Sequence, residues 1–241
     1  DVVGRYIIGV ASLLSGDSLY AIDLFEDLGK RLQGLDDTIP PIAVLKVRTP
    51  ARLYEAYHSE MMRLHSVWMA TRDKAMIRKL SDVVTKIQTL RPDDYNAHLE
   101  AAICAFILDR DTKKAMKEIK QCRKEKDRTW CYSKAFLLAY EGEMRQAIST
   151  YHSVFSNPSR DQSVPLQTEQ FIIDVLSEEP DKVQLHYCLG LINYFGKEDF
   201  AAARRDFCSF LASCPADVFG KERVEAKEYI EVIDSHERAV D

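Results

Sequence analysis

Residues 187–215 read YCLGLINYFGKEDFAAARRDFCSFLASCP, and this stretch decides the fold. Ala203 follows Gly190 by thirteen positions, and Phe207 and Phe210 follow Ala203 by four and seven. Spacings of four and seven place residues on one face of an α-helix. Glycine and alanine are small enough to let two helix backbones approach closely. The stretch therefore predicts two antiparallel helices that touch at a crossing of small residues.

The same pattern occurs three times earlier in the chain. In each case an alanine follows another small residue by twelve or thirteen positions, and apolar residues follow that alanine by four and seven. The three sets are Gly9, Ala21, Phe25 and Leu28; Ala102, Ala115, Ile119 and Cys122; and Ala135, Ala147, Tyr151 and Val154. Hairpins that stack side by side form an extended surface for holding another chain. The sequence therefore indicates a binding role rather than a pocket for chemistry.

These hairpins resemble the tetratricopeptide repeat, a helical hairpin of about 34 residues. The best match contains Leu189, Gly190, Tyr194 and Pro215 in addition to the Ala203 set. The pair of helices at 50–92 departs most from the pattern, because Leu80 stands where a small residue is expected. The resemblance implies an all-α fold, a right-handed α-solenoid of antiparallel helical hairpins with a C-terminal capping helix.

The predicted organisation has three parts. Residues 1–32 form an N-terminal hairpin of this kind, and 50–241 form a longer helical array whose cap is 218–241. The segment between them, 33–49, contains two adjacent prolines and two adjacent aspartates, and it predicts a linker that is either disordered or functional. Thr49 and Pro50 predict the start of the next helix, since proline is favoured at the first helical position.

Composition excludes some classes of partner. The net charge of −5 argues against a nucleic-acid binder, whose surface is usually basic. The segment 113–128 is locally basic; RNA binding there is the alternative to a solvated convex face. No apolar run approaches the ~20 residues needed to span a bilayer, so no membrane partner is expected. Six cysteines without a CxxC pair predict reduced thiols and a cytoplasmic location.

The resemblance also implies where a partner binds, because the first helix of each tetratricopeptide hairpin lines a concave groove. The matching positions here are apolar, so they do not form the carboxylate clamp of Lys, Asn and Arg known in this family. They predict a protein ligand, a peptide or an amphipathic helix. The implied groove residues are Tyr6, Val10, Leu13, Leu99, Ile103, Phe106, Tyr132, Phe136, Tyr187, Leu191 and Tyr194.

Three alternatives would also bury these apolar residues. A tight superhelix would bring them into contact with one another, and residues 39–47 would fill the groove if they folded back. A symmetric homodimer would cover the surface between two copies.

The sequence predicts no catalytic residues and no metal or cofactor site. The sequence contains no HExxH, GxSxG, GxGxxG or glycine-rich phosphate loop. His58 and His65 with Glu55 form a possible site, although polar residues at the edge of an amphipathic helix explain them. A zinc site at Cys208 and Cys214 with a nearby histidine is a further alternative.

The sequence therefore predicts a non-enzymatic scaffold or adaptor. The alternatives are an interaction or regulatory module of a larger multidomain protein, which the absence of an initial methionine suggests, and an all-helical enzyme of the toroid or prenyltransferase type.

Overall fold

The computed structural model describes residues 1–122, 127–157, 161–215 and 217–240, and side chains as far as residue 236. All regular secondary structure in these ranges is helical, which confirms the all-α prediction. The chain divides into two compact units, Asp1–Arg123 and Lys124–Asp241, called unit 1 and unit 2 below. No helix within the described ranges is long and apolar enough to span a bilayer.

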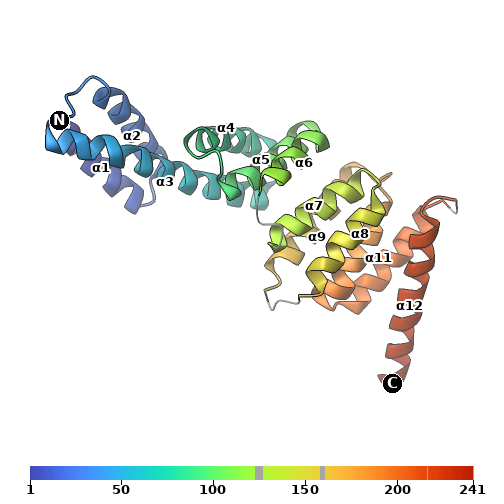
Figure 1. Ribbon diagram of the computed structural model, residues 1–241. Helices are drawn as coiled ribbons and strands as arrows, with labels where there is room; N and C mark the ends of the chain where they lie inside the picture. Colours follow the sequence, from blue (N-terminus) through green and yellow to red (C-terminus); the bar gives the residue numbers. More distant parts are fainter. Residues whose placement is uncertain (123–126, 158–160, 216, 241) are drawn as a thin grey trace. The chain divides into compact units, whose positions relative to one another are not determined.

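Unit 1 is built from helices that pack against their neighbours in chain order (Figure 1). They pair as three hairpins, α1 with α2, α3 with α4 and α5 with α6, and α2 and α4 also pack against the hairpin that follows. Their bounds are α1 Val2–Leu14, α2 Ser18–Leu32, α3 Pro40–Thr71, α4 Lys74–Leu90, α5 Tyr95–Asp109 and α6 Thr112–Gln121.

The first hairpin shows how local sequence sets the geometry. Gly16 adopts a φ of +86° in the turn, a conformation that costs glycine little. The Asp17 side chain then caps α2 by accepting a hydrogen bond from the Tyr20 amide. At the crossing, a Cβ on Gly9 would lie 2.9 Å from Cζ of Phe25, so only glycine fits against this ring. This hairpin and its small-residue crossing match the sequence prediction.

The segment 33–49 differs from the predicted linker. Only 33–39 lie outside a helix, because α3 begins at Pro40 and continues through Pro50. Proline at the start of α3 loses no helical hydrogen bond. α3 packs on α2, and Leu45 and Thr49 in its added part are buried, which offsets the backbone hydrogen bond that Pro50 cannot donate. Tertiary packing therefore overrides the local signal of a helix start at Pro50.

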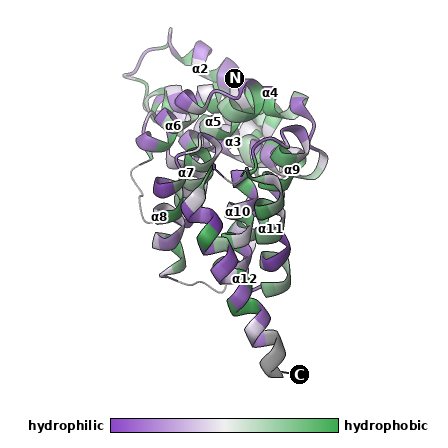
Figure 2. Cartoon of the chain, turned by 90° about the vertical axis from the view of Figure 1, so that its right-hand side faces the viewer, coloured by the Kyte–Doolittle hydropathy of each residue, from purple (hydrophilic) through white to green (hydrophobic). Residues whose placement is uncertain are grey.

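Unit 2 contains two stacked hairpins and two further helices. α7 pairs with α8, and α10 with its π-helical continuation η1 pairs with α11, while α12 packs on α11. Hydrophilic and hydrophobic residues alternate along α12, as expected for a helix with one face on the core (Figure 2). The bounds are α7 Arg128–Tyr140, α8 Met144–Phe155, α9 Ser163–Glu178, α10 Gln184–Leu191, η1 Ile192–Lys197, α11 Phe200–Ser213 and α12 Gly220–Val240.

The crossing of small residues predicted from 187–215 is present in unit 2. Gly190 on α10 lies against the ring of Phe207 on α11, and a Cβ on Gly190 would lie 2.8 Å from Cζ of that ring and closer still to two other ring carbons. Phe207, Phe210 and Tyr187 are all fully buried around this crossing. The handedness of the stack and its membership of the tetratricopeptide family stay predictions.

Candidate binding surfaces

Most of the predicted groove residues lie inside the units. Six side chains are buried by the chain itself and so have no surface to offer a partner in this conformation. They are Leu99, Phe106, Tyr132, Phe136, Tyr187 and Leu191. The others are partly exposed: Tyr6, Val10, Leu13, Ile103 and Tyr194.

Tyr187 shows why such residues are buried. Its ring packs edge-on against Phe207 and Phe210 with centroid distances of 5.6 and 5.3 Å. Its hydroxyl donates to Glu225 of α12 at 2.7 Å, and burial with this contact raises the pKa of Tyr187. The residue joins α10, α11 and α12, so its role is in packing between helices.

In unit 2 a helix of the same chain covers the first helices of the two hairpins. α9 lies beside α7 (Figure 1) and also packs against α10 and η1. Phe171 of α9 lies edge-on against Phe136 of α7 at 5.0 Å between ring centroids. Lys197 of η1 donates to Glu169 of α9 at 2.7 Å. In unit 2 the chain itself therefore covers the first helices with α9. Residues 39–47, which were the expected occupant, belong largely to α3 of unit 1.

The sequence of α9 carries an amphipathic pattern over the sixteen residues of the helix, Ser163–Glu178. Pro165, Ile172 and Val175 are its buried residues, at spacings of seven and three. This apolar stripe is typical of an amphipathic helix that begins before Pro165, since proline is tolerated in the first turn.

In unit 1 the first helix exposes apolar side chains. Val3, Ile7 and Leu14 of α1 are exposed, Leu14 to 83%, and Val10 between them is partly exposed. Their spacings of four, three and four place them on one side of the helix. The one charged residue within α1, Arg5, pairs with Asp27 of α2 at 2.9 Å, so this side of α1 carries no charge.

A second exposed stripe runs along α3. It consists of residues at spacings of three, four, four, three and four, and one of them, Val47, is 77% exposed. At its C-terminal end lies a shallow hollow of about 510 Å³ over Tyr54, Glu55, His58, Ser59 and Met62. The two stripes together are called the α1–α3 face: Val3, Ile7, Val10 and Leu14 of α1, and Val44, Val47, Ala51, Glu55, His58 and Met62 of α3.

The two stripes belong to one surface. α1 packs against α3, and the Arg52 guanidinium hydrogen-bonds Glu55 and the Tyr6 hydroxyl, contacts that raise the pKa of Arg52. On α1, the stripe lies next to Tyr6 on the side of the helix turned away from α2. On α3, the stripe likewise lies next to Arg52 on the side turned away from α2.

The α1–α3 face corresponds to the surface that α9 covers in unit 2. Val10 follows Gly9 at the first crossing, just as Phe136 follows Ala135 at the crossing of α7 and α8. Phe136 is covered by Phe171 of α9, whereas in the described part of unit 1 Val10 lies beside exposed neighbours.

The suggested site of His58, His65 and Glu55 does not form. His58 contacts Asn96 of α5 at 3.3 Å, and His65 contacts Glu100 of α5 at 2.9 Å. Glu55 pairs instead with Arg52 on its own helix at 2.5 Å. The two histidines hold α3 beside α5. Within the described ranges no three metal-ligating side chains come together.

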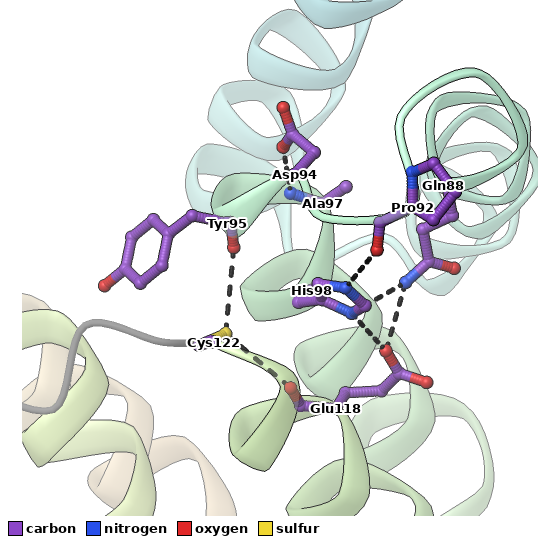
Figure 3. Close-up of polar contacts among 8 residues, drawn as sticks. All are labelled: Gln88, Pro92, Asp94, Tyr95, Ala97, His98, Glu118 and Cys122. Carbon is purple, nitrogen blue, oxygen red and sulfur yellow. Dashed lines mark hydrogen bonds and ion pairs between the residues drawn. The ribbon is translucent and has the colours of Figure 1, made fainter.

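A polar cluster that sequence reasoning missed joins α4, α5 and α6 (Figure 3). The buried His98 contacts Glu118 through Nδ1 at 2.7 Å and the Pro92 carbonyl oxygen through Nε2 at 2.9 Å. Gln88 donates to the same Glu118 oxygen at 3.0 Å. Both imidazole nitrogens are engaged, so the cluster presents no nitrogen to a substrate and serves to hold three helices together.

The zinc site suggested at Cys208 and Cys214 is not formed by the described residues, and RNA binding at 113–128 stays a prediction. The Cys214 thiol donates to the carbonyl oxygen of Val218 at 3.3 Å, and the described residues provide no ligand set with Cys208. The basic segment 113–128 lies partly outside the described residues.

Comparisons with known proteins show no matching family model and no similar curated protein.

The His65–Glu100 contact predicts a pH-dependent stability. Burial lowers the pKa of the His65 imidazole, but the hydrogen bond and charge of Glu100 outweigh burial and raise the pKa above 6.5. Folding therefore favours the protonated form, and this stabilisation is full below the unfolded pKa and lost as pH rises through the folded pKa. We expect the melting temperature of unit 1 to fall between about pH 6 and about pH 8, and to fall less in His65→Gln. Equal pH slopes in both proteins would contradict this.

Proposed function

We propose that this protein is a non-enzymatic scaffold or adaptor whose α1–α3 face holds an amphipathic helix of a partner protein. One observation carries the proposal. The equivalent surface of unit 2 is covered by α9, an amphipathic helix, whereas the α1–α3 face is exposed. Unit 2 thus already contains one amphipathic helix, α9, that packs on the first helices of two hairpins.

The chemistry of the α1–α3 face defines the ligand. Its α1 side and the N-terminal part of its α3 side are apolar and uncharged, and Glu55 and His58 add polarity only toward the other end. An extended exposed apolar surface is unusual in a monomer and is typical of an interaction site. The matching ligand is a helix whose apolar stripe ends in polar residues. All six cysteines are free thiols, which supports a reduced, cytoplasmic setting.

A labelled peptide tests the proposal directly. The probe is a fluorescein-labelled peptide of residues 161–180, which contains α9, and its fluorescence anisotropy is followed as the full chain is added. We expect saturable binding that weakens by at least about tenfold in an Ile7→Glu, Val47→Glu variant, because docking would bury two carboxylates among apolar groups.

Val224→Glu is the matched control, since Val224 is an exposed valine on α12 of unit 2, outside the α1–α3 face. This variant is expected to bind the peptide as the unaltered protein does. Absence of saturable binding, or an equal loss in the control, would refute the proposal. A dimer in sedimentation experiments that Ile7→Glu dissociates would identify a second copy as the occupant instead.

A further inference from the structure

The geometry of unit 2 points to a second helix-binding groove that α9 occupies in cis. We propose that the surface formed by α7, α10 and η1, called the α9 groove, admits a partner helix of the same chemistry when α9 leaves. This site lies in unit 2, and the inference does not depend on binding at the α1–α3 face.

The stack of unit 2 does not need α9 to hold it together. α10 contacts both α7 and α8 directly, and η1 also contacts α8. The two hairpins therefore pack on each other through their own residues. α9 is an added layer whose principal contacts are with α7, α10 and η1.

α9 is also less deeply buried than the helices beneath it. It has three buried residues, against eight in α7 and seven in the shorter α10. Leu166 and Ile173 are 49% and 44% exposed on its outer side. Elements with few buried apolar contacts open at lower free energy than the core around them.

The contacts of α9 specify the ligand. At the centre, Phe171 meets Phe136, so the groove takes an aromatic side chain there. Two residues before Phe171, Glu169 pairs with Lys197, and both side chains are less than a fifth exposed, at 18% and 15%. If α9 left without a replacement, this lysine would lose its carboxylate partner. The ligand is therefore an amphipathic helix with an aromatic residue and, two positions before it, an acidic one.

A second acidic contact lies near the C-terminal end of α9. The Tyr140 hydroxyl of α7 donates to Glu179 at 2.6 Å, and Lys182 lies over the Tyr140 ring at 3.9 Å. The groove thus prefers a helix that carries acidic residues on both sides of its aromatic anchor. Basic amphipathic helices would place like charge against Lys197 and are excluded.

The test weakens α9 in cis and leaves the groove intact. It uses the full chain carrying Ile7→Glu and Val47→Glu, so that the α1–α3 face does not contribute, and the labelled peptide of residues 161–180. Adding Glu169→Lys to the chain is expected to tighten peptide binding at least about tenfold, because the cis helix then opposes Lys197 while the peptide keeps its glutamate. Phe171→Ala, which removes the contact with Phe136 without adding charge, is expected to act in the same direction.

Gln170→Lys is the matched control, because Gln170 is the next residue and lies on the exposed side of α9. It is expected to leave peptide affinity unchanged. In hydrogen exchange, α9 amides should exchange at least about tenfold faster than those of α7 and α10. Unchanged affinity in both Glu169→Lys and Phe171→Ala, or equal exchange in the three helices, would overturn the inference. Neither result would bear on the α1–α3 face, which is tested separately by the loss of peptide binding in the Ile7→Glu, Val47→Glu variant.

Discussion

Replacing Phe207 with alanine is expected to lower the free energy of unfolding of unit 2 by about 3–5 kcal/mol. Phe207 is fully buried, and its ring lies 5.6 Å from Tyr187 and stacks on Tyr229 at 5.1 Å. Removing the ring loses its burial and leaves a cavity that the surrounding helices close only in part. The chain has one tryptophan in each unit, so Trp130 fluorescence in a Trp68→Phe background reports urea unfolding of unit 2 alone.

Gly190 provides the internal control for this prediction. A methyl group there would overlap the Phe207 ring, so Gly190→Ala is expected to cost about 1–3 kcal/mol in the unaltered background. In the Phe207→Ala background the overlap is gone, and the same change should cost almost nothing or stabilise the helix. Gly29 within α2 has nothing within 4 Å of its added Cβ, so Gly29→Ala should stabilise unit 1 by roughly 0.5–1 kcal/mol. If the losses in the free energy of unfolding from Phe207→Ala and Gly190→Ala were additive in the double variant, the proposed contact between the two residues would be contradicted.

The hairpins could be predicted because their signal is local. Gly9 with Phe25, and Gly190 with Phe207, lie within one pair of helices, and helical periodicity alone places them face to face. The start of α3 could not be predicted in this way. Pro50 follows a local rule for helix starts, but the helix begins at Pro40, and Leu45 and Thr49 before Pro50 are buried by tertiary packing.

The groove residues were predicted as a surface, and most of them are core. The pattern showed correctly that Phe136 stands beside a helix crossing, but its exposure depends on what lies above it. That is decided by Phe171 of α9, which is 35 residues away in the chain and has no periodic relation to it. Polar contacts such as that of His98 with Glu118 could not be predicted from local periodicity either, since they join separate helices. Local periodicity therefore predicts elements and crossings better than it predicts which faces stay open.

Removing the buried carboxylate of Glu60 is expected to destabilise unit 1 by about 2–3 kcal/mol. Glu60 of α3 is 2% exposed and accepts hydrogen bonds from the Ser18 hydroxyl at 2.7 Å and from Arg63 Nε at 2.8 Å. Glu60→Ala leaves the buried Ser18 hydroxyl without its acceptor. Glu60→Gln keeps an oxygen there and should cost less. Trp68 fluorescence in a Trp130→Phe background measures both, and equal losses would show that the acceptor for Ser18 is not what matters.

The lowered pKa of Glu60 also predicts that unit 1 loses stability as the pH falls. Burial raises the pKa of Glu60, but the hydrogen bonds from Arg63 and Ser18 outweigh burial and bring the pKa below 4.5. A carboxyl group whose folded pKa is lowered contributes stability above its unfolded pKa, and the contribution is lost as pH falls through the folded pKa. Between about pH 7 and about pH 3, the unaltered protein should therefore lose more stability than Glu60→Gln, whose amide does not titrate. If both lose the same amount, Glu60 is not held as the charged form, and the pairing of Ser18 and Arg63 with it would have to be abandoned.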